Sequence, residues 1–462
     1  MHLLLIAYDF PPTPSPQSLR WAYLVRELSA AGHTVQVIAP DIPGYGPGGL
    51  PYMPEGLEIH RVDPGRFARL LMGRNKRLVP NRDVVGSAQA LVQPVLHVAP
   101  QPLSELNWKG RLRRRIESSI GAAGGLNWKG ALAEKAKAAV SRHVFPDHRV
   151  EWVRHAVDEL DMLIAARRPD VVIVSHEPAC SLPVGLAAAK RGLPLVVDMG
   201  DPVLAPYTPN KWRKQAYALE QAVCNAAMMI SVTNEGAAQT LQERHAIPGD
   251  KLLVVPQGFD SCYVATAQER MVHFDESRLE LLYTGSFYSF RRAEDVLDAV
   301  RAVPGVRLTI ATINAPRYLI EAAEMAPESI RLIGFMPHRA ALAAQRDCDV
   351  LLNLANADPV QVPGKVFEYL GAGKPILHLR GGQQDATGEI LMRMGAGWQM
   401  ASERALIEQV LLEMKELKAQ DQLSHRVADG AQAADYAWSA LAVKWSERLG
   451  MIIAHKNRGI AA

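Results

Sequence analysis

The first forty residues alternate between apolar runs and a segment with helical spacing. Residues 3–7 are apolar throughout, as expected of a parallel strand that is covered on both faces. Over residues 18–31 large apolar side chains recur every three or four positions, which predicts a helix, and Gly32 follows as its C-cap. A second strand is predicted over residues 34–39. This order is typical of a β-α-β unit with a right-handed crossover.

The same alternation continues in two separate cycles. The first cycle resumes at residue 149 and predicts strands over residues 170–175, 193–198, 227–233 and 251–255. A polar stretch over residues 266–277 interrupts it. The second cycle then predicts strands over residues 279–283, 307–311, 330–333, 350–353 and 375–379. Two such cycles predict an α/β protein with two doubly wound, Rossmann-like domains that face each other across a cleft.

Between about residues 85 and 145 the periodic pattern disappears. Pro, Gly and Ser recur over residues 86–104, and a basic stretch follows that contains Trp108 and Trp128. This insertion has two interpretations. Tryptophans among basic residues suit an anionic membrane surface, with each indole at the level of the lipid headgroups. We favour the alternative, an excursion or lid of the N-terminal domain whose charges are solvated.

Length and charge narrow the class of protein. The chain has 462 residues, with 51 Lys and Arg against 48 Asp and Glu, so the formal net charge is only +3. We expect no nucleic-acid partner, because a dedicated nucleic-acid binder usually has a stronger basic excess. No apolar run approaches the ~20 residues that span a bilayer, and residues 1–7 lack the basic start of a signal peptide. We therefore expect a cytoplasmic enzyme.

The segment over residues 362–376, VPGKVFEYLGAGKPI, carries the strongest chemical signal. Pro363 ends the preceding loop, and a helix is predicted to begin at Gly364, where free backbone N–H groups suit a phosphate. Lys365 and Glu368 are three residues apart and therefore share one face of the first turn. A cation for phosphate and a carboxylate for sugar hydroxyls would together hold a nucleotide sugar. The alternative is a surface ion pair on an ordinary helix.

This segment resembles the donor-binding helix of GT-B-fold glycosyltransferases of family 4, the group-1 transferases. The likeness extends, in the same order along the chain, to residues 10–20, 26–35, 254–260 and 283–286. The resemblance implies an acceptor-binding domain over residues 1–265, a nucleotide-sugar-binding domain over residues 278–435, and a C-terminal helix over residues 436–462 that returns to the first domain.

The resemblance also implies an activity. A hexosyltransferase of this family moves a sugar from a nucleotide-diphosphate sugar to an acceptor hydroxyl, with retention at the anomeric carbon. We expect the acceptor to be a saccharide or a lipid-linked glycan of cell-surface polysaccharide synthesis. No cofactor is expected, since the nucleotide sugar is a substrate. If the acceptor is lipid-linked, we expect the basic insertion to contact the inner face of an anionic membrane.

The resemblance assigns roles on the donor side. Glu368 would hold the ribose of the nucleotide, beside Gly364 and Lys365. Gly285, together with one arginine of the pair at positions 291 and 292, would hold the diphosphate, because a guanidinium group presents a planar fork to phosphate oxygens. The donor-side candidates are Gly285, Arg291, Arg292, Gly364, Lys365 and Glu368. Many relatives have another glutamate eight positions before the one that corresponds to Glu368. This chain has Val360 at that position.

The catalytic candidates are Asp201 and His176. Each follows a predicted strand, and active sites of doubly wound sheets lie at the carboxyl ends of the strands. Asp201 would orient or deprotonate the acceptor hydroxyl, and its alternative role is that of a turn or N-cap residue. The alternative for His176 is that this histidine has only a structural role. Residues 347–349, Asp-Cys-Asp, match a short metal-binding motif, but they directly precede a predicted strand, so we expect a metal-independent reaction.

Two other functions stay open. A nucleotide-sugar 2-epimerase has the same two-domain fold, although residues 10–20, which resemble an acceptor loop, argue against it. A non-catalytic nucleotide-sugar-binding protein is favoured by the absent glutamate at position 360.

Overall fold

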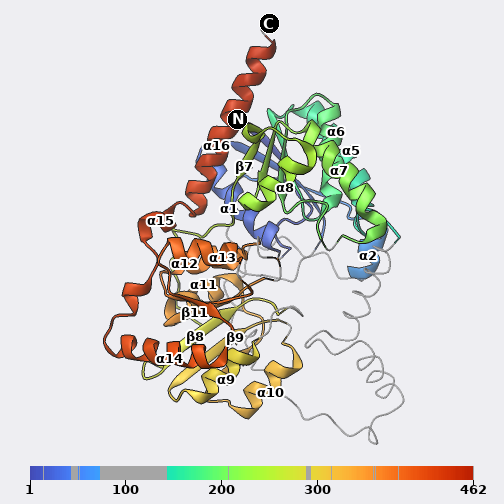
Figure 1. Ribbon diagram of the computed structural model, residues 1–462. Coiled ribbons are helices and arrows are strands. Elements are labelled where there is room, and N and C mark those ends of the chain that lie inside the picture. Colours follow the sequence, from blue (N-terminus) through green and yellow to red (C-terminus); the bar gives the residue numbers. More distant parts are fainter. Residues whose placement is uncertain are drawn as a thin grey trace, which may run out of the picture. The chain divides into compact units, whose positions relative to one another are not determined.

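The computed structural model describes residues 1–13, 15–42, 50, 53–72, 143–206, 208–287, 293–313, 315–356, 358, 361–382 and 384–460. These residues divide into two compact units (Figure 1). Unit 1 comprises the described residues within 1–72, 143–261 and 435–460. Unit 2 comprises the described residues within 262–434. The basic insertion predicted over about residues 85–145 lies outside the described residues, except for its last three positions.

Unit 1 is built on a parallel sheet with the strand order β3-β2-β1-β4-β5-β6-β7. The strands are β1 (His2–Ile6), β2 (Thr34–Pro40), β3 (Glu58–Val62), β4 (Val171–Ser175), β5 (Leu195–Gly200), β6 (Met229–Val232) and β7 (Leu252–Val254). The register pairs Ile6 with Ile38 on one side of β1 and with Val174 on the other. Because β1, β4, β5 and β6 are buried on both faces, their sequences are nearly continuous apolar runs.

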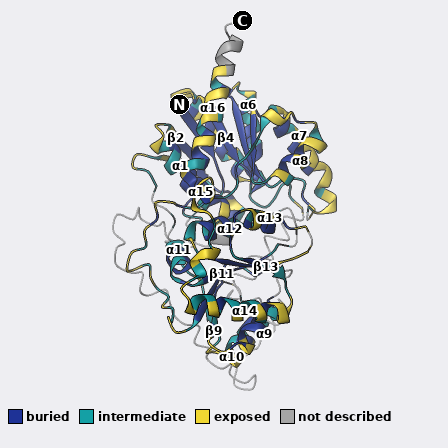
Figure 2. Cartoon of the chain, turned by 60° about the vertical axis from the view of Figure 1, so that its left-hand side comes forward, coloured by how far each residue is buried: buried dark blue, intermediate teal, exposed yellow. Residues whose placement is uncertain are grey.

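Helices cover both faces of this sheet, so the strands lie between two separate layers of core. One layer involves α5 (Trp152–Ala166), α6 (Leu182–Lys190), α7 (Arg213–Ala226) and α8 (Glu235–His245). The other layer involves α1 (Pro16–Ala30) and α16 (Trp438–Ile460). Trp21 of α1 meets Trp445 of α16 edge to face, with ring centroids 5.6 Å apart. Figure 2 shows the strands as the buried centre of the unit, with exposed residues on the outer sides of the helices.

Gly258 shows why the loop after β7 contains a glycine. A Cβ atom at this position would lie 2.7 Å from the backbone oxygen of Tyr436 and 2.9 Å from a methyl group of Leu441. Next to this contact, the N–H of Phe259 donates to the Tyr436 oxygen at 3.1 Å. The loop is therefore joined backbone to backbone with the segment that leads into α16.

Unit 1 also contains an ion pair that is fully removed from solvent. Arg20 of α1 donates from Nε to Asp198 Oδ2 at 2.9 Å and from Nη2 to Oδ1 at 3.0 Å. Its Nη1 donates to the backbone oxygen of Pro256 at 2.8 Å. Both charged side chains are 0% exposed. Arg20 is thus a core residue that joins α1, β5 and the loop after β7.

Unit 2 repeats the architecture with the strand order β10-β9-β8-β11-β12-β13, again all parallel. The strands are β8 (Leu279–Thr284), β9 (Val306–Ala311), β10 (Ile330–Ile333), β11 (Val350–Leu354), β12 (Ile376–Arg380) and β13 (Trp398–Ala401). One face packs against α9 (Glu294–Ala302), α10 (Arg317–Met325) and α14 (Arg404–Ala419). The remaining helices include α11 (His338–Asp347), α12 (Gly364–Ala372), α13 (Ala386–Arg393) and α15 (Gly430–Ala434). Each unit, taken by itself, confirms the predicted α/β, doubly wound, Rossmann-like class.

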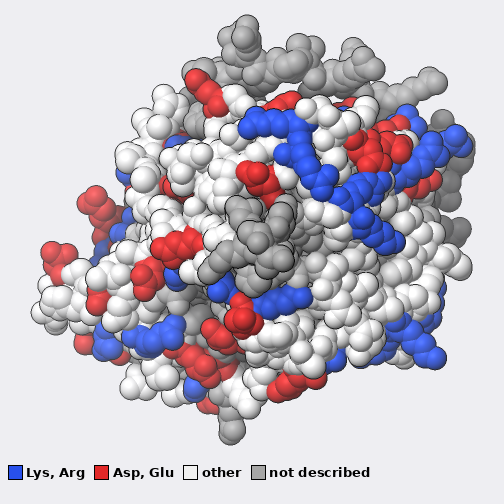
Figure 3. Space-filling model, turned by 90° about the horizontal axis from the view of Figure 1, so that it is seen from above, with Lys and Arg blue, Asp and Glu red and all other residues white. Residues whose placement is uncertain are grey.

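Two further observations concern surfaces. Among the described residues, no helix is both long enough and apolar enough to cross a membrane. On the face drawn in Figure 3, basic and acidic side chains are interspersed, with neither sign covering the surface alone. This distribution agrees with the nearly neutral net charge of the sequence.

Candidate functional site

The donor-side candidates of unit 2 meet where β8 ends and α12 begins. Gly285 directly follows β8 with a φ of +129°, and its N–H donates to the Ala311 oxygen at 3.0 Å. A Cβ atom at Gly285 would lie 3.7 Å from Cδ and 3.8 Å from Nζ of Lys365. The Lys365 ammonium group also lies over the ring of Tyr283, 3.7 Å from its centroid. The loop after β8 and the first turn of α12 are therefore neighbours.

Glu368 lies one turn further along α12 and faces α11. Gln345 donates from Nε2 to Glu368 Oε2 at 3.4 Å, and His338 Nδ1 lies 3.7 Å from Oε1. The Glu368 side chain is only 16% exposed. Because Gln345 and His338 both belong to α11, Glu368 contacts a second helix.

Tyr369 fixes α12 against the end of β8. Its hydroxyl accepts a hydrogen bond from the N–H of Thr284 at 3.0 Å and lies 3.1 Å from Thr284 Oγ1. Burial raises the pKa of the Tyr369 hydroxyl above its ordinary value, so it stays neutral. Sequence reasoning missed Tyr369, Gln345 and His338. The signal for His338 is its position directly after Pro337, where a helix begins.

Several donor-side predictions fall on positions without a described structure. Arg291 and Arg292 lie outside the described residues, as does Val360. Gly364 is the first residue of α12, and Pro363 precedes it as N-cap without a side-chain cap. The helix thus begins with backbone N–H groups, as predicted.

The Asp-Cys-Asp segment has structural partners. Asp347 pairs with Arg270, and Asp349 Oδ2 accepts from Glu280 N at 2.8 Å and from Lys418 Nζ at 2.5 Å. Cys348 is buried. Among the described residues, no group of three or more His, Cys, Asp and Glu side chains is placed to hold a metal ion.

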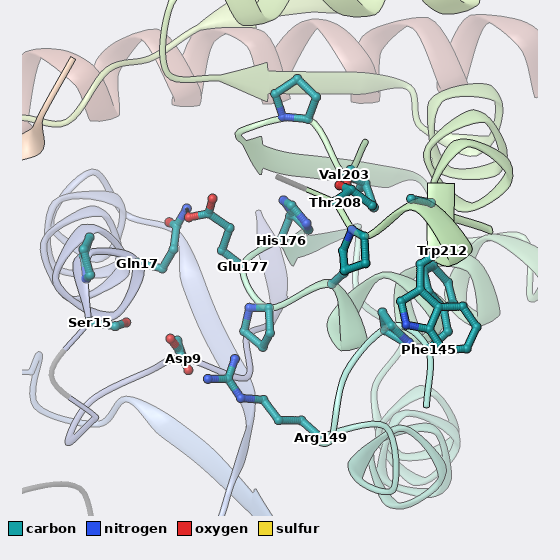
Figure 4. Close-up of a pocket in the computed structure, with 17 residues that line it drawn as sticks. Asp9, Ser15, Gln17, Phe145, Arg149, His176, Glu177, Val203, Thr208 and Trp212 are labelled. Carbon is teal, nitrogen blue, oxygen red and sulfur yellow. Dashed lines mark hydrogen bonds between the residues drawn. The ribbon is translucent and has the colours of Figure 1, made fainter. Parts of the chain in front are cut away.

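Unit 1 contains a cavity of about 370 Å³ beside the carboxyl ends of β4 and β5 (Figure 4). Its volume falls within the usual range of small-molecule sites. The lining has a polar part and an apolar part. The described residues that line it are Asp9, Ser15, Pro16, Gln17, Phe145, Pro146, Arg149, His176, Glu177, Pro178, Ala179, Pro202, Val203, Thr208, Pro209, Trp212 and Ala216.

The predicted catalytic residues lie at this cavity or next to it. His176 is part of the lining and is 6% exposed, and its Nδ1–H donates to the Met199 oxygen at 2.7 Å. Burial lowers the pKa of His176, although the charge of Asp201 acts in the opposite direction. The imidazole is therefore neutral. Asp201 stands directly before the lining residues Pro202 and Val203.

Glu177 is a cavity residue that sequence reasoning missed. It has a φ of +64°, a left-handed conformation that is uncommon for residues other than glycine. Its Oε2 accepts from Gln17 Nε2 at 3.2 Å. Burial raises the pKa of Glu177 to about 7, and the charges of Asp198 and Asp9 act in the same direction. Glu177 is thus a carboxyl group that changes charge near neutral pH.

Gly200 makes room for this arrangement. It ends β5 with a φ of +65°, and a Cβ atom there would lie 2.7 Å from Gln17 Nε2 and 3.7 Å from the Glu177 carboxyl carbon. A methyl group at position 200 would therefore press on the hydrogen bond between Gln17 and Glu177. No sequence pattern near residue 177 indicates this contact, because Gln17 is 160 positions away.

A second carboxyl group lies across the cavity. Burial raises the pKa of Asp9, and the nearby Arg149 guanidinium group opposes the shift. Arg149 also lies over the ring of Tyr8, 5.2 Å from its centroid. Among the described residues that line the cavity, Arg149 is the only lysine or arginine.

A family model matches part of the chain, and solved structures match nearly all of it. Residues 111–258 match the family model of the glycosyl transferase 4-like domain. A search of curated proteins found no significant match.

Solved structures give three informative matches, each at 12% identity. A sucrose-phosphate synthase from Thermosynechococcus elongatus matches with a TM-score of 0.61, over 98% of this chain and 100% of that one. WaaG, a glycosyltransferase involved in lipopolysaccharide biosynthesis, matches with a TM-score of 0.57, over 97% of this chain and 99% of that one. A UDP-GlcNAc 2-epimerase from Methanocaldococcus jannaschii matches with a TM-score of 0.52, over 98% of this chain and 100% of that one. Over residues 111–258 the chain thus matches the glycosyl transferase 4-like domain, the chain has the GT-B fold, and the predicted resemblance to family 4 glycosyltransferases is confirmed.

Proposed function

We propose that this protein is a hexosyltransferase that moves a sugar from a nucleotide-diphosphate sugar to an acceptor hydroxyl. The observation that carries the proposal is the grouping of Gly285, Lys365 and Glu368 where β8 ends and α12 begins. Ligands of open α/β sheets bind at the carboxyl ends of the strands, and helix N-termini bind phosphate. The family match over residues 111–258 supports the same reaction class.

In this proposal the charges of the donor are met by preorganised groups. The Lys365 ammonium group and the first N–H groups of α12, at Gly364, offset the negative charge that develops on the leaving diphosphate. Glu368 accepts hydrogen bonds from the ribose hydroxyls. The reaction retains the anomeric configuration and requires no metal ion. Residues 278–435 form the donor domain, and residues 1–265 together with the helix over residues 436–462 form the acceptor domain.

The cavity of unit 1 is the proposed acceptor site. His176, as a neutral imidazole, binds a hydroxyl group, and Asp201 orients it. We propose a saccharide or lipid-linked glycan as acceptor, and the name of WaaG, which refers to lipopolysaccharide biosynthesis, supports that class. A cytoplasmic location and contact with an anionic membrane stay predictions, and the latter is tested by sedimenting the protein with anionic vesicles at low salt.

Glu368→Ala is expected to weaken nucleotide-sugar binding by about 10- to 100-fold, because hydrogen bonds to a charged group contribute about 1.5–3 kcal/mol. The measurement is a calorimetric titration with each member of a panel of nucleotide sugars. The exposed carboxylate Glu276 of the same unit provides the control. Glu276→Ala should bind the donor as the wild type does. Equal donor affinity in Glu368→Ala and the wild type would contradict the assignment.

The same panel separates the alternative functions. A transferase hydrolyses its donor slowly when no acceptor is present and transfers the sugar when one is added. An epimerase instead converts the free nucleotide sugar into its 2-epimer. A protein that binds a nucleotide sugar, yet neither hydrolyses nor transfers it, would be the non-catalytic alternative and would contradict the proposal.

A further inference from the structure

Glu177 and Gln17 are polar groups of the unit 1 cavity that the proposed function does not yet use. Gln17 is 4% exposed, and its Nε2 donates to Glu177 Oε2. Its Oε1 is buried and has no hydrogen-bond partner among the described residues. A buried amide oxygen without a partner costs free energy, so its persistence beside a cavity points to a ligand that donates a hydrogen bond.

The backbone around these groups is arranged at a cost. Glu177 is held at a φ of +64°, a backbone conformation that residues other than glycine rarely adopt and that stores strain. Gly200 leaves the space that the Gln17 side chain occupies. In Figure 4 the carboxyl group of Glu177 points toward Gln17, with His176 beside it. Strain of this kind concentrates at ligand-binding positions.

The apolar part of the cavity limits the chemical class of its ligand. Phe145 and Trp212 are neighbours with ring centroids 5.7 Å apart, and the lining also contains several prolines. Aromatic rings pack well against the C–H face of a sugar ring, whereas hydroxyl groups suit carboxylates and amides. A pyranose presents both kinds of surface.

Charge distinguishes a neutral saccharide from an anionic one. Asp9 and Glu177 both line the cavity, while Arg149 is its only described lysine or arginine and lies beside Asp9. A phosphate group in the cavity would therefore meet two carboxyl groups and one cation that is already engaged.

From these contacts we infer that Glu177 and Gln17 form the acceptor-binding pair of the cavity, with Glu177 taking hydrogen bonds from hydroxyl groups of a neutral saccharide. The assignment of the bound saccharide as the acceptor rests on the proposed function. Saccharide binding itself is measured without any sugar transfer. Glu177 binds as a carboxylate, and Gln17 Oε1 takes a further hydroxyl.

The charged form of Glu177 depends on the groups that face it. These are Arg20 and Gln17 of α1, Asp198 of β5, Asp9 after β1, and His176 of its own loop. With a pKa of about 7, Glu177 is mostly protonated at pH 6 and mostly ionised at pH 8. Because the carboxylate is the acceptor of hydrogen bonds, saccharide binding should strengthen as pH rises, by up to about tenfold between these values.

The test uses the full chain and a panel of neutral methyl hexopyranosides and disaccharides, with a hexose 6-phosphate as the anionic comparison. Binding is followed by calorimetry and ligand-observed NMR at pH 6 and pH 8. Glu177→Gln keeps the size of the side chain and removes its charge. We expect it to weaken binding of the neutral saccharide at pH 8 by about tenfold or more and to abolish the pH dependence. Gln17→Leu should also weaken binding.

Glu447→Gln is the matched control, since Glu447 is exposed on α16. It should leave both affinity and pH dependence unchanged. Circular dichroism and the thermal midpoint verify that each variant is folded. If Glu177→Gln binds the neutral saccharides as the wild type does at both pH values, the inference is wrong. It is equally wrong if the sugar phosphate binds better than every neutral saccharide or if no saccharide of the panel binds. Failure of the proposed function would appear separately, as absence of nucleotide-sugar turnover.

Discussion

Replacing Arg20 with alanine is expected to lower the free energy of unfolding of unit 1 by about 3–5 kcal/mol. The reason is that the Asp198 side chain, 0% exposed, would be left in the core without the guanidinium group that pairs with it. The Pro256 oxygen would lose its donor as well. Urea unfolding followed by tryptophan fluorescence measures the change, because Trp21 follows Arg20 in α1 and packs against Trp445 of α16.

A matched exposed pair separates burial from charge. Arg191 and Asp161 form an ion pair in the same unit, with side chains 31% and 51% exposed. Arg191→Ala should cost less than about 1 kcal/mol, since exposed pairs contribute little. The double variant Arg20→Met with Asp198→Leu should regain much of the loss, because an apolar pair removes the unpaired charge. A similar cost for Arg20→Ala and Arg191→Ala would contradict this explanation.

The alternation of apolar runs was sufficient to predict most strands of both sheets, but neither β3 nor β13 and not the order of the strands. Strands β1, β4, β5, β8 and β11 are buried on both faces, so each is a largely apolar run that stands out in the sequence. Some edge strands lack this signal. Strand β3 (Glu58–Val62) was missed because an edge strand has a neighbour on one side only and its sequence, EIHRV, is largely polar.

The candidate site could be predicted only in part, for a comparable reason. Lys365 and Glu368 are close in sequence, so helical spacing indicates their shared face. Glu177 stands next to a residue that was singled out, His176, yet its role depends on a left-handed backbone and on Gln17, which is distant in sequence. Likewise, nothing near Asp198 indicates that its partner is Arg20, 178 positions away.

Gly397→Ala is expected to destabilise unit 2 strongly, because this glycine combines two constraints. Its φ is +89°, where a side chain costs about 1–3 kcal/mol. In addition, a Cβ atom would lie 2.5 Å or less from the backbone N and O atoms of Ile376, which cannot move without shifting β12. Overpacking of this kind costs a further ~1–3 kcal/mol or more. Differential scanning calorimetry should show a lower transition temperature for unit 2 and an unchanged one for unit 1.

Gly395 provides the control that divides the two constraints. It lies in the same turn between α13 and β13 with a φ of +62°, but no atom lies within 4 Å of its Cβ position. Gly395→Ala should therefore carry the cost of the backbone angle alone, and the difference between the two variants measures the close approach to Ile376. If both variants lost the same stability, the contact with β12 would be irrelevant. Since β12 pairs with β11 in register from Ile376 onward, a larger loss in Gly397→Ala would show that this turn sets the position of β12 in the sheet of unit 2.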